Sequence, residues 1–169
     1  MGVVFAAVLV GMLVWLKLTA IPPVQPATAT NQVLCQSLGN PAVHYHSHLD
    51  IFDKGQKETL PAGIGLTATC DYWLHTHDTT GVIHIEAPAS QAHTKFTLAD
   101  FFSLWGQPLG PQQVAQYKVG SGQSLIAFVN GKRYSGDPGS IVLKAHEDIA
   151  LEIVPPLQTP PRFQWPAGL

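Results

Sequence analysis

Charge is scarce in this sequence, and neither sign is in large excess. Asp, Glu, Lys and Arg make up only 12% of its 169 residues, and the formal net charge is −2. A nucleic-acid-binding domain needs a basic surface to meet phosphate groups, so the composition argues against a nucleic-acid partner. Hydrophobic residues make up 46% of the chain, which is too many for a chain that stays disordered.

The sequence also lacks the short motifs that mark common enzyme classes. It contains no G-x-S-x-G, H-E-x-x-H, C-x-x-C or P-loop pattern. Its only methionines are Met1 and Met12, which argues against a blue-copper site built from Cys, His and Met. Glu86 lies too far beyond the neighbouring histidines for the spacing of a cupin. Motifs therefore assign no catalytic residue.

Cysteine is rare as well, with Cys35 and Cys70 as the only two copies. In an oxidising compartment an isolated pair usually forms a disulfide bond, and this is the expectation here. The bond would close a loop around the first group of histidines and stabilise the fold by about 3–4 kcal/mol in the chain-entropy treatment. The alternatives are two buried thiols, or one thiolate that serves as a metal ligand.

One long apolar run opens the chain. Residues 2–16 read GVVFAAVLVGMLVWL, and counting on to Ile21, past Lys17, gives about 20 residues, enough to span a bilayer. The triplet Ala27-Thr28-Ala29 has the small-x-small form of a signal-peptide cleavage site. We expect residues 1–21 to be a signal peptide or a membrane anchor. Both place the rest of the chain outside the cytoplasm and make the membrane, or a protein within it, the expected partner.

Proline-rich segments flank a single expected domain. Residues 22–32 (PPVQPATATNQ) are typical of an extended linker. Residues 155–169 carry five prolines and cannot continue a sheet or helix, so we expect this tail to wrap the surface, anchored by Phe163 and Trp165. Residues 33–154 form the domain, and with the tail they leave roughly 138 residues, enough for one core.

Alternation with period two predicts a mainly β domain, an antiparallel sandwich or barrel-like fold with one short helix. Strands are expected at 43–52, 64–66, 72–77, 82–87 and 125–129, with two more within 140–154. Turns are expected at residues 53–56 and at Asn130-Gly131. The helix is LADFFSLW, which Thr97 caps and Gly106 ends.

Histidine is the residue that stands out. The chain has eight copies against nine Lys plus Arg, and six of them fall between residues 44 and 84. Side chains two positions apart on a strand point to the same side. His44, His46 and His48 should therefore share one face of the first strand, and His75 and His77 should share one face of another.

The second histidine tract predicts a three-nitrogen site. A tight turn centred on residues 79–80 sets His75 opposite His84, and cross-strand neighbours have Cβ atoms about 4.5–5.5 Å apart. His75, His77 and His84 should then converge on one face. A His-x-His strand with a third histidine on its neighbour is typical of catalytic zinc and several copper sites.

Carboxylates stand close to this predicted site. Asp78 and Glu86 are candidates to fix the imidazole tautomers from behind the ligands. The first tract, with His44, His46 and His48, is expected to complete the same site or to form another. His93 and His146 have no comparable partners and are interpreted as ordinary histidines.

Four blocks of sequence, HYHSHLDIF, LPAGIGL, WLHTHDTTGVIHIEAP and FTLADFFSLWGQPL, cover most of residues 43–109. In this order they resemble a family of uncharacterised bacterial proteins that are exported or membrane-anchored. The resemblance implies export and a single domain, and it implies no activity.

The expected function is binding of zinc or copper outside the cytoplasm, for buffering, for delivery or as an accessory to a membrane complex. A metalloenzyme is the first alternative, in which an open three-histidine site activates water or oxygen. A second alternative is an interaction module whose histidines form a neutral hydrogen-bonded network. A third is a cluster that senses pH.

Overall fold

A computed structural model describes residues 32–169 of the chain. The signal peptide or anchor predicted at residues 1–21, and the linker as far as residue 31, lie outside the described residues. Between residues 32 and 169, no helix is both long and apolar enough to cross a lipid bilayer.

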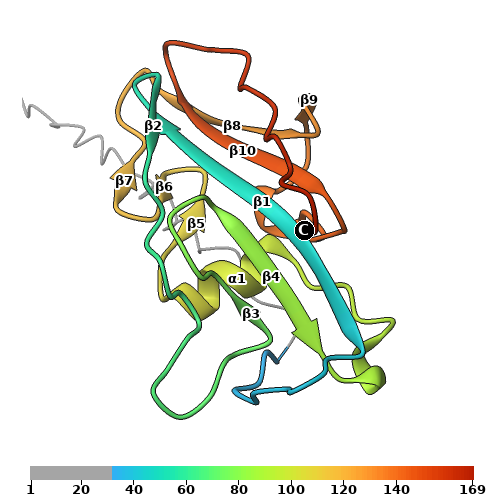
Figure 1. The fold of residues 1–169 in the computed structure, drawn as a ribbon. Coiled ribbons are helices and arrows are strands. Elements are labelled where there is room, and N and C mark those ends of the chain that lie inside the picture. Colours follow the sequence, from blue (N-terminus) through green and yellow to red (C-terminus); the bar gives the residue numbers. More distant parts are fainter. Residues whose placement is uncertain (1–31) are drawn as a thin grey trace, which may run out of the picture.

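A seven-stranded sheet forms the centre of the described chain (Figure 1). Its strands run in the order β3-β4-β1-β10-β8-β9, and β2 also pairs with β1. The bounds of these strands are β1 Val43–Asp53, β2 Gln56–Glu58, β3 Leu74–His75, β4 Val82–Ala87, β8 Ser124–Val129, β9 Lys132–Tyr134 and β10 Glu147–Val154.

The remaining elements are short. Three small strands, β5 Leu109–Gly110, β6 Gln113–Val114 and β7 Tyr117–Lys118, make a second sheet. One α-helix, α1 (Leu98–Trp105), and two 3-10 turns at Ala89–Gln91 and Pro138–Ser140 complete the described part of the chain. This confirms the prediction of a mainly β domain with one short helix.

Strand β1 organises the large sheet. Its first part, Val43–His48, pairs antiparallel with β4, and its second part, Ser47–Asp53, pairs with β10. The β1–β10 pair is parallel, whereas the other pairs in this sheet are antiparallel. Alternation along a strand predicts which face a residue occupies but not the partner strand, so the sequence did not predict this parallel pair.

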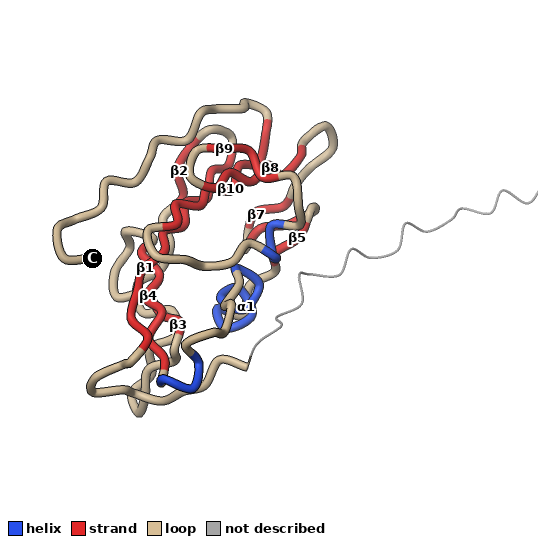
Figure 2. Tube along the Cα trace, turned by 90° about the vertical axis from the view of Figure 1, so that its right-hand side faces the viewer, coloured by secondary structure: helices blue, strands red, loops and turns tan. Residues whose placement is uncertain are grey.

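The two faces of the large sheet have different chemistry. On one face, apolar side chains such as Leu49, Ile85 and Ile149 are fully buried and belong to the same core as Phe101 of α1. The other face of β1 carries the first histidine tract. Helix α1 covers the apolar face, and the C-terminal segment lies on the opposite side of the sheet (Figure 2).

Helix α1 begins and ends where the sequence predicts. The Thr97 hydroxyl accepts the backbone N–H of Asp100, and the Asp100 carboxylate accepts the backbone N–H of Thr97, which together form a capping box. Gly106 ends the helix with a left-handed φ of 68°. The cap holds the helix against the sheet, where Phe101 and Phe102 are buried.

The strand predicted at residues 64–66 is wrong, because this segment forms a turn. Gly63 and Gly65 have φ values of 74° and 75°, which glycine adopts without strain. A Cβ atom on Gly65 would lie 2.3 Å from the carbonyl oxygen of Leu74. The glycines thus allow the turn to pack closely against β3.

Two other strand predictions are correct only in part. Residues 140–154 contain one strand, β10, instead of two, because Val142 forms only an isolated bridge with Thr97 beside the start of α1. The strand predicted at residues 72–77 is reduced to Leu74–His75.

The predicted disulfide bond between Cys35 and Cys70 is present. Cys35 also forms an isolated bridge with Tyr72, just before β3. The bond therefore attaches the first described segment of the chain to the hairpin that carries the second histidine tract.

The tail at residues 155–169 lies on the polar face of the sheet, whereas the sequence predicted only that it would wrap the surface. The Phe163 ring stacks on the His48 imidazole with ring centroids 3.8 Å apart. Trp165 contacts His48 and His146, with ring centroids 6.4 and 4.7 Å away. Both aromatic residues named from the sequence therefore anchor the tail.

Candidate metal centre

The hairpin of β3 and β4 has the predicted register. His75 lies directly opposite His84, and the backbone N–H of Glu86 donates to the carbonyl oxygen of Trp73 over 2.8 Å. The Asp78–Gly81 turn joins the two strands, and Asp78 stabilises it by accepting hydrogen bonds from the backbone N–H and the hydroxyl of Thr80. This register brings the side chains of His75, His84 and Glu86 onto one face of the sheet.

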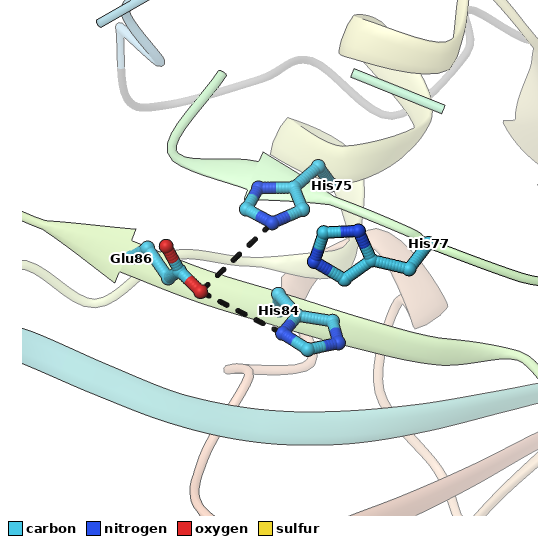
Figure 3. A group of neighbouring side chains, drawn as sticks. All are labelled: His75, His77, His84 and Glu86. Atoms are coloured by element: carbon cyan, nitrogen blue, oxygen red, sulfur yellow. Dashed lines mark ion pairs between the residues drawn. The ribbon is translucent and has the colours of Figure 1, made fainter. Parts of the chain in front are cut away.

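Four donor groups converge on that face (Figure 3). His75, His77, His84 and Glu86 each offer one ligand atom, and these atoms all lie within 4.8 Å of one another. Oε1 of Glu86 is 4.0 Å from Nε2 of His75 and 3.7 Å from Nδ1 of His84. These spacings are typical of groups that could close around one ion with small side-chain movements.

Glu86 was predicted to stand behind the ligands. The structure places its carboxylate among the imidazole nitrogens, so Glu86 can serve as a ligand itself. Asp78, the other carboxylate proposed for that role, is exposed and accepts hydrogen bonds from Thr80. Its contribution lies in the turn between the two strands. The Thr80 hydrogen bonds also hold the pKa of Asp78 below its usual value.

The buried His75 ring is oriented by the backbone. Its Nδ1 lies 2.8 Å from the carbonyl oxygen of Tyr72. A carbonyl oxygen only accepts, so Nδ1 carries a proton, and in the neutral ring the lone pair is therefore on Nε2, the nitrogen nearer to Glu86. Outer hydrogen bonds of this kind fix the tautomer of metal-binding histidines. The sequence could not predict this contact, because the partner is a backbone atom.

The first histidine tract lies beside the second. In the β1–β4 pair, His46 is opposite His84 and His44 is opposite Glu86. Nε2 of His46 is 3.1 Å from Nδ1 of His84, and Nε2 of His44 is 3.3 Å from Oε1 of Glu86. His44, His46 and His84 form a further group of ligand atoms within 4.8 Å of one another.

The central imidazoles are held in the neutral form. Burial and then the neighbouring His46, His77, His75 and His44 rings lower the pKa of His84 to about 3. Burial, followed by the proximity of His44, also lowers the pKa of His46. A neutral imidazole has a free lone pair, which is the form that binds a metal ion.

His48 occupies a different position from the other members of its tract. Its Nδ1 is 2.9 Å from Oδ1 of Asp148, and its Nε2 is 3.1 Å from the Thr80 carbonyl oxygen and 3.3 Å from Oδ1 of Asp50. Both nitrogens face acceptors, so the ring carries two protons and has no lone pair for a metal. His48 belongs to neither group of candidate ligands.

The two remaining histidines differ from each other. His146, predicted to have no comparable partner, lies beside His46: its backbone N–H donates to the His46 carbonyl oxygen over 2.8 Å. It lines a cavity of about 320 Å³ together with His44 and His46. His93 lines a different cavity and belongs to neither group of candidate ligands. No signal in the sequence separates His146 from His93, because the contact is through the backbone.

Comparisons with protein-family models, curated proteins and solved structures find no match for this chain.

Proposed function

We propose that this protein binds a transition-metal ion, zinc or copper, through His75, His77, His84 and Glu86. The observation that carries the proposal is the convergence of four donor atoms, from β3, β4 and the segment between them, within 4.8 Å of one another. The fixed Nδ1 hydrogen bond of His75 and the lowered pKa of His84 support it, because both keep a lone pair available to the ion.

The donor set favours zinc or copper over magnesium or calcium. Imidazole nitrogens suit zinc and copper, whereas the two hard cations select oxygen ligands. Thiolate ligands are not available, because Cys35 and Cys70 form the disulfide bond.

A set of three imidazoles and one carboxylate favours binding of the metal over catalysis. Glu86 can take the coordination position that a catalytic site leaves open for water. We infer buffering or delivery of the ion outside the cytoplasm, or an accessory role beside a membrane complex. The disulfide bond and the apolar run at residues 2–16 support this location.

The test is the zinc content of variants of the full-length protein loaded and purified side by side. His77→Ala and His84→Ala should bind Zn²⁺ at least about 100-fold more weakly than the wild type, because each removes a ligand and not only an outer contact. His93→Ala is the matched control and should bind like the wild type.

Two results would contradict the proposal. One is equal zinc in His77→Ala and His93→Ala, and the other is a wild type that takes up no zinc or copper. The histidines would then form a hydrogen-bonded network without a metal.

A further inference from the structure

The histidine-rich face has more donors than one ion can use. Zinc in proteins is almost always four-coordinate, and His75, His77, His84 and Glu86 already supply four ligand atoms. His44 and His46 remain beside them on β1. The six donors fall into two groups that have only His84 in common.

The second group has the spacing of a chelate. Nε2 of His46 and Nδ1 of His84 are 3.1 Å apart, close to the separation of two ligands on one ion with bonds of about 2.0–2.1 Å. The His44 and His46 rings meet edge to face with centroids 5.0 Å apart. Since both project from the same face of β1, their nitrogens can close on an ion from one side.

Glu86, a member of the first group, also lies beside the second. Its Oε1 is 3.3 Å from Nε2 of His44, which belongs to one group, and 4.0 Å from Nε2 of His75, which belongs to the other. A carboxylate has two oxygens and can ligate two ions at once. Two-metal sites in proteins hold their ions about 3.5–4 Å apart in this manner.

Solvent reaches the second group through a cavity. The space of about 320 Å³ beside His44 and His46 is lined on its other walls by His146 and by the end of the tail, Gly168 and Leu169. The cavity leaves room for water to complete the coordination of an ion that His44 and His46 hold.

We propose that this face of the sheet binds two metal ions, one held by His75 and His77 and a second held by His44 and His46. Glu86 lies between the two ions and can ligate both through its two oxygens, whereas the neutral His84 ring has one lone pair and completes the coordination of one of them. This inference rests on the proposed function, because it adds a second site to the first.

The test is the stoichiometry of Zn²⁺ binding to the metal-free, full-length protein with its disulfide intact, measured by calorimetric titration and by equilibrium dialysis. The wild type and the control His93→Ala should bind two equivalents. The double variant His44→Ala/His46→Ala and the double variant His75→Ala/His77→Ala should each bind one.

A second measurement needs no variant. When two equivalents of Cu²⁺ are bound, ions at this separation should show spin coupling in electron paramagnetic resonance, including a half-field transition. The coupling should be absent from the protein loaded with one equivalent.

The outcomes separate the two-ion proposal from the proposed function. One equivalent of Zn²⁺ in the wild type, or two Cu²⁺ ions without spin coupling, overturns the two-ion proposal and leaves the proposed function standing. No bound Zn²⁺ or Cu²⁺ in the wild type overturns both.

Discussion

The His84 imidazole lies at the centre of the cluster, with ring centroids of His46 and His77 each 4.4 Å away. Burial and these neighbours make the protonated form unfavourable, so the pKa of His84 falls to about 3. An unperturbed histidine in the unfolded chain has a pKa of about 6.5. Between about pH 3 and pH 6.5, His84 is therefore neutral in the folded metal-free protein and protonated in the unfolded chain.

This difference predicts how pH changes the stability of the metal-free protein. A base whose folded pKa is lowered contributes full stability above the unfolded pKa and loses it as pH falls below about 6.5. Relative to His84→Gln, the wild type should lose stability between pH 7 and pH 5. Urea unfolding of both proteins, with a chelator present, measures the free energy of unfolding at each pH. If that free energy changes with pH in the same way in both proteins, the prediction is contradicted. In an NMR titration of the wild type, the His84 ring should stay neutral down to pH 5.

Residue spacing predicted part of the site, and the limit of that prediction has a physical reason. Period two placed His44, His46 and His48 on one face of β1, and this is what the structure shows. The neighbours of each ring depend on the strands alongside: β4 places His84 beside His46, whereas β10 places Asp148 beside His48. Within the first tract, His44 and His46 therefore belong to a group of candidate metal ligands, whereas His48 forms an ion pair with Asp148.

At the scale of elements, the ion pair of His48 joins β1, β10 and the tail. The Asp148 carboxylate accepts hydrogen bonds from His48, from Nε of Arg162 and from the backbone N–H of Phe163. Burial alone lowers the pKa of His48, but the hydrogen bonds to Asp148 and Asp50 outweigh it and raise the pKa above its usual value. Burial alone raises the pKa of Asp148, but the hydrogen bonds from His48, Phe163 and Arg162 outweigh it and lower the pKa.

These two shifts predict a stabilising effect with a defined pH window. The raised pKa of His48 contributes stability that is complete below about pH 6.5 and is lost as pH rises through the folded pKa. The lowered pKa of Asp148 contributes stability above about pH 4, which is lost in acid. His48→Gln should therefore destabilise the protein by about 1.5–3 kcal/mol near pH 6, and by less at pH 8.5.

Urea unfolding of the metal-free protein at the two pH values measures this prediction, with the exposed His93→Gln as the control. A loss of stability in His48→Gln that is the same at pH 6 and pH 8.5 would show that the buried ring is neutral.

Local signals in the sequence predicted the hairpins and the helix, because their determinants lie within a few residues. The turn at Asn130-Gly131 has left-handed φ values of 53° and 73°, as such a turn requires, and Thr97 caps α1. The parallel pairing of β1 with β10 depends on contacts between segments about a hundred positions apart, such as His48 and Asp148. No local pattern carries that information.

At the scale of the whole molecule, one face of the sheet contributes to the apolar core and the other carries the candidate metal ligands. The core between the sheet and α1 stabilises the fold through apolar side chains, so the opposite face can carry imidazoles and carboxylates. The disulfide bond connects the first described segment to the loop that leads into β3. It closes a loop with a sequence separation of 35 and is expected to contribute about 3–4 kcal/mol.

Two features support the prediction that the protein is exported. The apolar run at residues 2–16 is predicted to direct the chain to or across a membrane, and the Cys35–Cys70 bond forms readily only in an oxidising compartment. A reporter joined after Leu169, which leaves the tail on the sheet, should be active if it works only outside the cytoplasm and inactive if it works only inside. Mass analysis of the exported protein should show the two cysteines without their thiol hydrogens. Activity of the cytoplasmic reporter, together with two thiols that alkylate freely, would contradict export and would remove the main support for an extracytoplasmic metal-binding role.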